Sequence, residues 1–219
     1  MQKHFRLKNI ITSLMVTLCL VLSSQSWGQT LEKVTIQLNW FHQFQFAGYY
    51  AAKEQGFYKE LGLEVELREF RGKEAIEDYV IDGRAQYGIS DSSLIVAKSK
   101  GKPVVIVTQI FQHSPATLAT LRSSGISTPF ELLGKRILAD SVSENNAPII
   151  AMLKQAGIDI SEYTWLKENY QLSTLKNGGT DAVLIYSTDE PFKFNEENID
   201  IFIIDPRDYG IDFYGDNLF

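Results

Sequence analysis

Aromatic side chains are concentrated in one short stretch near the start of the chain. From Trp40 to Tyr50 they occupy six of eleven positions: Trp40, Phe41, Phe44, Phe46, Tyr49 and Tyr50. Such rings bury large areas and stack on flat heterocycles, so the stretch serves either a hydrophobic core or the wall of a ligand pocket. The spacing of four between Phe46 and Tyr50 places both rings on one helical face and favours the core for them. Trp40, Phe41 and Tyr49 fit either role, and they are the candidates for ligand contact.

A polar group follows the third predicted strand. Ser90, Asp91 and the two serines after them begin a helix that we expect to run to about residue 100. Serine and aspartate at such a position often serve only as helix caps. A helix N-terminus also attracts anions, but the carboxylate of Asp91 would repel a phosphate. If Ser90 and Asp91 contact a ligand, we expect them to meet a neutral or amine-bearing group of it.

Other polar residues are candidates because of their place between predicted elements. Glu190 follows the carboxyl end of a predicted strand, where a carboxylate can accept two hydrogen bonds from a ligand. Alternatively, it is a solvated acid beside Asp189. Gln112 and His113 lie at a predicted crossover between two lobes, where a polar pair can face a cleft. Ser141 begins a polar loop that offers hydrogen bonds, although a surface loop of this composition needs no ligand.

Catalytic and metal sites have little support in the sequence. His42 and His113 are the only histidines after residue 28, and no acid or cysteine spacing accompanies them as a zinc site requires. The chain has no Gly-x-Ser-x-Gly elbow and no phosphate-binding loop. We therefore expect no catalytic residue, no bound metal and no cofactor.

The first 28 residues have the pattern of an export signal. Three basic residues within the first eight precede an apolar run of 13 residues, 10–22. This length suits a signal-peptide core and is short for a membrane span. Small residues at Ser26 and Gly28 predict cleavage after Gly28, and an uncleaved anchor is the alternative. We expect a periplasmic protein.

Removal of this segment changes the balance of charge. The formal net charge goes from −6 to −9, because three basic residues leave and no acid does. An acidic exported chain is a poor partner for nucleic acid or anionic lipid, so we expect a small-molecule ligand instead. Cys19 is the only cysteine and lies within the removed segment. The mature chain would therefore have neither disulfides nor thiol chemistry.

Strands alternate with helices along the remaining chain. Val34, Ile36 and Leu38 alternate with polar residues, as one face of a strand does. The run from Val104 to Ile110 is rich in β-branched residues and predicts a strand buried on both faces. The pattern from Thr128 to Glu131 is a capping box with proline at the first helical position, so a helix begins there.

The order of these elements predicts an α/β chain with largely parallel sheets. A break in the pattern near residues 113–116 divides the chain into lobe one, 29–115, and lobe two, 116–208. Residues 209–219 then form a return crossover to lobe one. No final helix follows, so we expect the C-terminal part of lobe one to be missing from this chain.

Short motifs in a familiar order carry a family resemblance. They are QLNW at 37–40, GYYAA at 48–52, GFY at 56–58, GISDS at 88–92, GKPV at 101–104, GKRI at 134–137, EPF at 190–192 and YGIDFYGD at 209–216. Together they resemble the periplasmic solute-binding proteins for thiamine-pyrimidine precursors and sulfonates. The resemblance covers nearly all of the chain after residue 28. It implies a two-lobed fold of the type II periplasmic-binding-protein kind, with ligand bound between the lobes.

The resemblance also implies a ligand class and partners. A small heterocycle is expected, first of all a thiamine-pyrimidine precursor whose aminopyrimidine edge Glu190 would hold. Some relatives are free proteins that serve a membrane transporter, and others are sensory domains fused to a signalling module. Both kinds of partner remain open for this chain.

One branch of the family is enzymatic and supplies the alternative function. The thiamine pyrimidine synthases build the aminopyrimidine phosphate from pyridoxal phosphate and a histidine of their own, with iron. That branch has a lysine shortly after the glycine of the third strand and a histidine four residues further. Here these positions are Ser90 and Leu94, and the branch's cysteine cluster is absent. Schiff-base formation needs a primary amine, so solute binding remains the main expectation.

Overall fold

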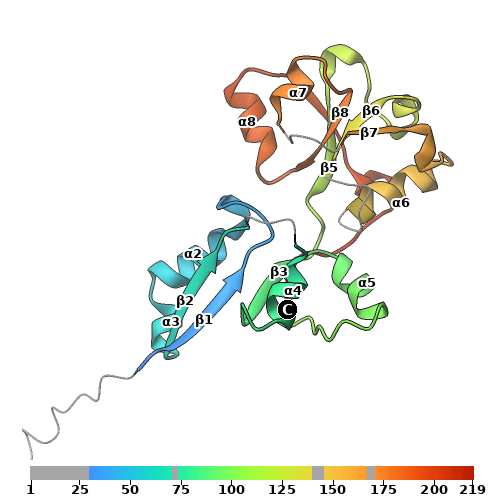
Figure 1. Cartoon of the computed structure of the whole chain (residues 1–219). Coiled ribbons are helices and arrows are strands. Elements are labelled where there is room, and N and C mark those ends of the chain that lie inside the picture. Colours follow the sequence, from blue (N-terminus) through green and yellow to red (C-terminus); the bar gives the residue numbers. More distant parts are fainter. Residues whose placement is uncertain (1–29, 71–73, 140–145, 167–170) are drawn as a thin grey trace, which may run out of the picture.

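The computed structural model describes residues 30–70, 74–139, 146–166 and 171–219. They form two lobes, each built around a five-stranded sheet with helices packed against it (Figure 1). The strand order is β2-β1-β3-β10-β4 in the first lobe and β7-β6-β8-β5-β9 in the second. This confirms the predicted α/β class and its two lobes. The export signal predicted for residues 1–28 lies outside the described residues.

The first lobe's sheet brings the ends of three strands to one edge. β1 (Glu32–Gln37) pairs in parallel with β2 (Leu63–Arg68) and with β3 (Tyr87–Ser90). β10 (Gly215–Leu218) arrives from the second lobe and lies antiparallel between β3 and β4 (Thr108–Phe111). The carboxyl ends of β1 and β3 therefore lie beside the start of β10. This is the edge at which open α/β sheets bind ligands.

The hydrophobic core of this lobe joins β1 to the aromatic stretch. Val34, Ile36 and Leu38 cluster with Phe46, which is 0% exposed, and Tyr50 packs partly buried against them. The core role predicted for Phe46 and Tyr50 is thus confirmed. The helices of the lobe are η1 (Phe44–Phe46), α2 (Ala47–Glu54), α3 (Phe57–Glu60), α4 (Ile76–Ile81) and α5 (Ser93–Ser99).

The segment from Val104 to Ile110 differs from its prediction. Only its end enters a strand, β4, which lies at the edge of the sheet. Val105 is 71% exposed and Val107 is 59% exposed. The prediction of a strand buried on both faces is therefore wrong. A run of β-branched residues indicates extended backbone, but it does not say which neighbours cover that backbone.

Gly88 in β3 is packed too closely for a side chain. A Cβ atom there would lie 2.6 Å from Cε1 of Phe219 and 3.0 Å from Cγ2 of Ile76. The backbone of Phe219 exchanges two hydrogen bonds with Gly88, which holds its ring in place.

We therefore expect Gly88→Ala to lower the free energy of unfolding by about 1–3 kcal/mol. Gly48→Ala is the control, because no atom lies within 4 Å of its added Cβ and the residue is helical. The control should be neutral or stabilising. Urea denaturation compares the two variants, and equal losses would contradict the packing argument.

The second lobe's sheet mixes parallel and antiparallel pairs. β6, β7 and β8 are parallel, and β5 runs antiparallel between β8 and β9. The strands are β5 (Ala116–Leu121), β6 (Arg136–Leu138), β7 (Thr164–Leu166), β8 (Ala182–Tyr186) and β9 (Ile201–Ile204). The helices are η2 (Arg122–Ser124), η3 (Pro129–Leu132), α6 (Ala147–Gln155), η5 (Ile160–Glu162), α7 (Ser173–Lys176), α8 (Glu190–Glu196) and η6 (Pro206–Tyr209).

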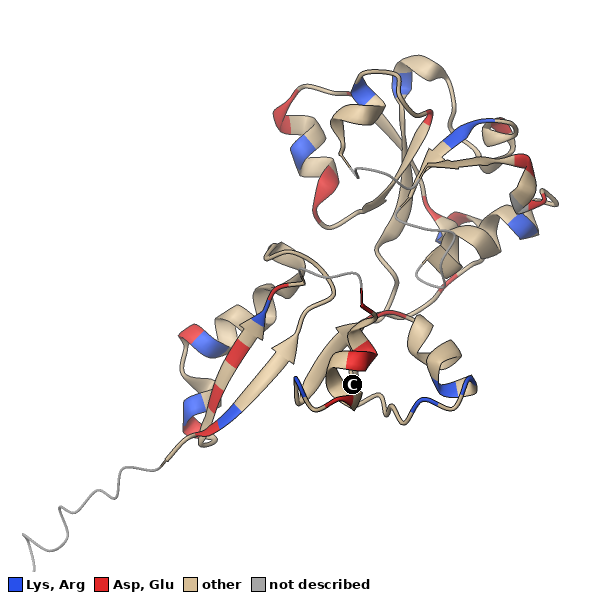
Figure 2. Cartoon of the chain, in the orientation of Figure 1, with Lys and Arg blue, Asp and Glu red and all other residues tan. Residues whose placement is uncertain are grey.

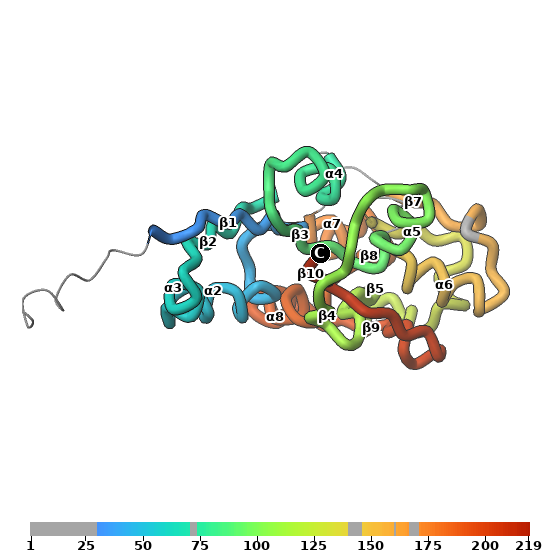
Figure 3. The backbone as a smooth tube through the Cα atoms, turned by 90° about the horizontal axis from the view of Figure 1, so that it is seen from below, coloured from blue at the N-terminus to red at the C-terminus, as the bar shows by residue number. Residues whose placement is uncertain are grey.

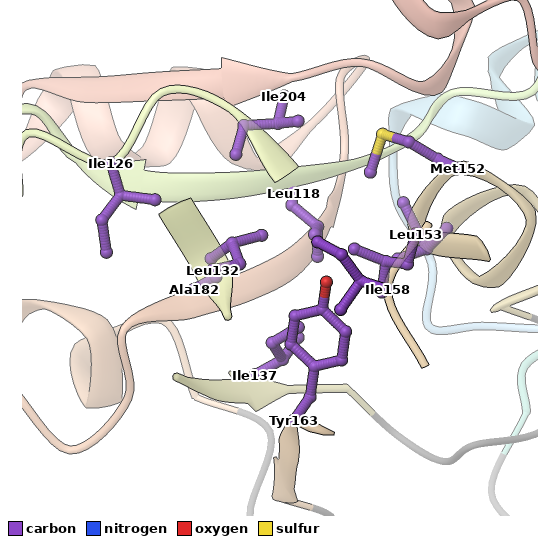
Figure 4. Packing of buried hydrophobic residues seen from close by; sticks show 11 residues of the cluster. Leu118, Ile126, Leu132, Ile137, Met152, Leu153, Ile158, Tyr163, Ala182 and Ile204 are labelled. Carbon is purple, nitrogen blue, oxygen red and sulfur yellow. The ribbon is translucent and has the colours of Figure 1, made fainter. Parts of the chain in front are cut away.

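A compact apolar cluster holds α6 to one face of this sheet (Figure 4). Leu118 and Ile137 come from the sheet, and Met152 and Leu153 from α6; all four are 0% exposed. The ring of Tyr163 closes the cluster, and burial raises the pKa of its hydroxyl to about 12. The second lobe therefore has a core of its own.

The helix start at Thr128 is confirmed as a capping box. Oε2 of Glu131 accepts a hydrogen bond from the backbone N–H of Thr128 at 2.9 Å. The helix that follows is η3, a short 3-10 helix. The cap therefore fixes the start of the turn that leads the chain to β6.

Two segments connect the lobes. One runs from β4 to β5 and the other from η6 to β10, and both cross the space between the lobes (Figures 1 and 3). His113 in the first and Asp212 in the second are in contact, with 2.8 Å between Nδ1 and Oδ2. The predicted boundary after residue 115 falls between β4 and β5, which belong to different sheets.

Charged residues of both signs are interspersed over both lobes (Figure 2). Within the described ranges, no helix has the length and apolar character that crossing a membrane requires.

Candidate ligand-binding site

Four polar side chains meet at the ligand edge of the first lobe's sheet. Asp216, at the start of β10, is 1% exposed. Its Oδ1 accepts a hydrogen bond from Nδ2 of Asn39 at 3.1 Å, and its Oδ2 accepts one from Nε2 of Gln45 at 3.3 Å. Asp91 follows β3 and accepts a hydrogen bond from the backbone N–H of Ser93 at 2.8 Å. We call Asn39, Gln45, Asp91 and Asp216 the carboxylate cluster.

The electrostatics of the carboxylate cluster favour protonation. Burial raises the pKa of Asp216 to about 7; the charge of Asp91 adds to this rise, and the hydrogen bonds from Asn39 and Gln45 oppose it. Burial also raises the pKa of Asp91. Two carboxyl groups that are disfavoured as anions, close to one another, form a site that gains from a positive or hydrogen-bond-donating ligand.

The aromatic candidates flank this cluster in different environments. Trp40 is partly buried against the core of the lobe, and its ring meets that of Phe41 edge to face at 5.4 Å between centroids. Phe41 is 54% exposed. Tyr49 is 9% exposed, and burial and the charge of Asp216 raise the pKa of its hydroxyl. Trp40 and Phe41 thus offer ring surface at the lobe's edge, whereas Tyr49 lies in the core.

Glu190 belongs to the second lobe, at the start of α8. It is 4% exposed, and its Oε2 accepts a hydrogen bond from the backbone N–H of Tyr186 at 2.7 Å. Its Oε1 lies 3.7 Å from Nζ of Lys193. Burial raises the pKa of Glu190. The carboxylate therefore ties α8 to the carboxyl end of β8, and Asp189 and Lys193 act on the same group.

The remaining candidates are dispersed. Ser90 is the last residue of β3 and is 6% exposed, and its Oγ lies 3.4 Å from Oγ of Ser93. Because Ser90 belongs to the strand, α5 begins at Ser93, three residues later than predicted. Gln112 is exposed and donates to the backbone oxygen of Gln109 at 3.0 Å. His113 is exposed and pairs with Asp212. Ser141 lies outside the described residues.

Comparison with protein families places the chain among known proteins. Residues 43–219 match the family model described as NMT1/THI5 like. The chain belongs to the NMT1/THI5-like family. This confirms the resemblance seen in its motifs.

Relatives of the chain differ in what their names say that they bind or make. The formylaminopyrimidine-binding protein of Halalkalibacterium halodurans is 23% identical over 97% of this chain and 65% of its own length. A 4-amino-5-hydroxymethyl-2-methylpyrimidine phosphate synthase of Legionella pneumophila is 29% identical over 60% of this chain and 42% of its own length.

Solved structures show the same fold. The periplasmic aliphatic sulphonate binding protein SsuA of Escherichia coli superposes with a TM-score of 0.67 at 18% identity, over 85% of this chain and 64% of that one. The described chain thus spans about two-thirds of the length of such relatives.

Three members of the carboxylate cluster escaped the sequence reasoning. Asn39 and Asp216 stand in QLNW and YGIDFYGD, two of the motifs that carry the resemblance, and Gln45 lies between two aromatic residues. Asn39 lies two residues after the end of β1, close to the position where an open sheet contacts its ligand. Asp216 carries no such local signal, because its partner Asn39 is 177 residues away.

Metal binding finds no support in this region. Within the described ranges, no group of three or more histidine, cysteine, aspartate or glutamate side chains is placed to hold a metal ion. The carboxylate cluster provides two acids and two amides, which suit a ligand with hydrogen-bond donors.

Proposed function

We propose that this chain is the solute-binding part of an uptake or sensory system and captures a small heterocycle between its lobes. A thiamine-pyrimidine precursor is the first candidate ligand. The observation that carries the proposal is the carboxylate cluster beside Trp40, at the ligand edge of the first lobe. A stacking ring next to hydrogen-bond acceptors suits a flat ring with amino groups.

Capture would proceed by closure of the two lobes. In the described part of the chain two segments connect them, so rotation about residues 112–115 and 210–214 would move each lobe as a unit. Trp40 would stack on the ligand, while Asp91 in the first lobe and Glu190 in the second would orient its donor groups. Their positions at the starts of α5 and α8 support these roles.

The proposed function also implies where the protein is exported to and which partner it serves. Export to the periplasm would be directed by residues 1–28, and a membrane transporter or a fused signalling module would receive the ligand or the signal. The name of a periplasmic sulphonate-binding structural neighbour supports export. No cofactor is needed for capture, and pyridoxal phosphate with iron enters only under the enzymatic alternative.

Synthase activity is the second candidate, favoured by the similarity to the Legionella enzyme. It would need an amine and an imidazole at positions 90 and 94. Ser90 is buried at the end of β3, and Leu94 is 1% exposed within an apolar cluster with Val104 and Phe219. These side chains pack the lobe and supply neither group.

Calorimetric titration with aminopyrimidines, alkylsulfonates and pyridoxal phosphate tests the proposal. Heat of binding with an aminopyrimidine at micromolar concentration is the expected result. Turnover of pyridoxal phosphate in the presence of iron would favour the synthase function over solute binding. Binding of sulfonates alone would show that the ligand is a sulfonate and not a pyrimidine.

Trp40→Ala should weaken aminopyrimidine binding by roughly tenfold or more, because the stacking surface is lost. The variant should lose less free energy of unfolding than free energy of binding, since the ring is only partly buried. Trp165→Ala is the control: it removes the same side chain, partly buried, from β7 of the second lobe. A similar loss of affinity in both variants would remove Trp40 from the site.

A further inference from the structure

The pairing of β10 with β3 sets the two acids of the carboxylate cluster side by side. In this antiparallel pair Leu218 lies opposite Ile89 and Asn217 lies opposite Ser90. Asp216 precedes Asn217 in β10 and Asp91 follows Ser90, and the charge of Asp91 acts on Asp216. Asn39 reaches the same place from the end of β1 and donates to Asp216. Three chain segments thus bring two carboxyl groups and one amide to one point of the sheet edge.

Within the described residues, the groups around this point supply no compensating charge. Asp216 receives its hydrogen bonds from two neutral amides, those of Asn39 and Gln45. Asp91 receives one from a backbone N–H. The other charged or titratable groups that act on the pair or on its neighbour are Glu77 in α4, Tyr49 in α2 and Tyr58 in α3. None of these described groups is a cation, so within the described residues nothing compensates the pair.

Tyr49 gives a second, independent sign of a missing group. Its hydroxyl is buried, and within the described part of the chain it has no hydrogen-bond partner. The charge of Asp216 acts on this hydroxyl, so the two groups are near neighbours. A buried hydroxyl without a partner costs roughly 1–3 kcal/mol, and such groups are uncommon in folded proteins. A polar ligand group beside Asp216 would satisfy it.

We propose that Asp91 and Asp216 form an anionic subsite that takes a cationic nitrogen group of the ligand, a protonated amine or the amidine-like edge of an aminopyrimidine. The subsite rests on the proposed function, which places the ligand at this edge. It selects against phosphate esters and sulfonates, because their anionic groups would add a third negative charge. The transported heterocycle is therefore an unphosphorylated, amine-bearing one.

Binding at this subsite releases a proton. In the free protein the pair holds a proton at mildly acidic pH, since burial raises the pKa values of both acids and the charge of Asp91 raises that of Asp216 further. A cation that enters replaces this proton, which passes to solvent, and both carboxylates are then ionised against the ligand. Affinity for a cationic ligand should therefore rise with pH until the pair is ionised without help.

Titration calorimetry of the whole chain with three matched probes tests the subsite. The probes are an aminomethylpyrimidine, its hydroxymethyl analogue and the phosphate ester of that analogue. The aminomethyl probe should bind tightest, with affinity rising roughly tenfold between about pH 5 and about pH 7. Asp216→Asn should remove both the preference and the rise. Asp82→Asn, an exposed acid at the end of α4, should keep both.

The outcomes separate the subsite from the proposed function. Equal affinity for the three probes, unchanged by Asp216→Asn, would overturn the subsite and leave pyrimidine capture standing. Absence of binding by all three probes would overturn the proposed function and the subsite with it. If circular dichroism shows that Asp216→Asn does not fold, Asp91→Asn provides the same comparison, because Asp91 is the less buried member of the pair.

Discussion

Replacing Phe46 by alanine should lower the free energy of unfolding by about 3–5 kcal/mol. Phe46 is 0% exposed and is among the largest fully buried side chains of the chain. It packs on Leu38 and the other inward-facing residues of β1, where a cavity has no neighbour free to fill it. Urea denaturation followed by circular dichroism measures the loss.

Phe44→Ala is the matched control two residues away. Phe44 belongs to the same 3-10 helix, but its side chain is 75% exposed. Its removal should change the free energy of unfolding by no more than about 0.5 kcal/mol. If the two variants lost equal stability, the division of the aromatic stretch into core and surface rings would be wrong.

The framework of the fold was predictable because its signals are local. Alternation along β1 and the short apolar runs of β8 and β9 mark strands within a few residues. The Val104–Ile110 run shows the limit of such signals. Its composition is that of a central strand, yet its neighbours leave Val105 and Val107 exposed, and neighbours are set by the whole topology.

The candidate site was predictable only in part, for the same reason. Asp91 directly follows β3 and Trp40 lies three residues after β1, so position alone selects them. Asp216 becomes a candidate only when β10 is known to lie between β3 and β4, a pairing of segments distant in sequence. Tyr49 was a candidate for ligand contact after Trp40, but the turn of α2 directs it inward. The rotation of one helix decides such a question.

Without ligand, the protein should lose stability as the pH rises from about 4 to about 7. The pKa of Asp216 in the folded chain is about 7, against 3.8 for an ordinary aspartate. A carboxyl whose folded pKa is raised binds its proton more tightly when folded. Its stabilising contribution is therefore complete below the unfolded pKa and is lost as the pH passes through the folded one. The slope should reach about 1.4 kcal/mol for each pH unit.

Other titrating groups affect the profile but can be separated. Asp91 and Glu190 have raised pKa values and act in the same direction. Asp181, lowered by its hydrogen bond with Arg136, acts in the opposite direction and only at lower pH. Unfolding free energies measured across this range should therefore fall less steeply in Asp216→Asn than in the parent chain, while Asp82→Asn keeps the parent slope. A parent profile that is flat, or that rises with pH, would show that folding does not raise the pKa of Asp216. Ionisation of Asp216 costs folding free energy at neutral pH, and the described residues around it supply no cation. A cationic ligand that binds there would restore this stability, as the proposed subsite requires.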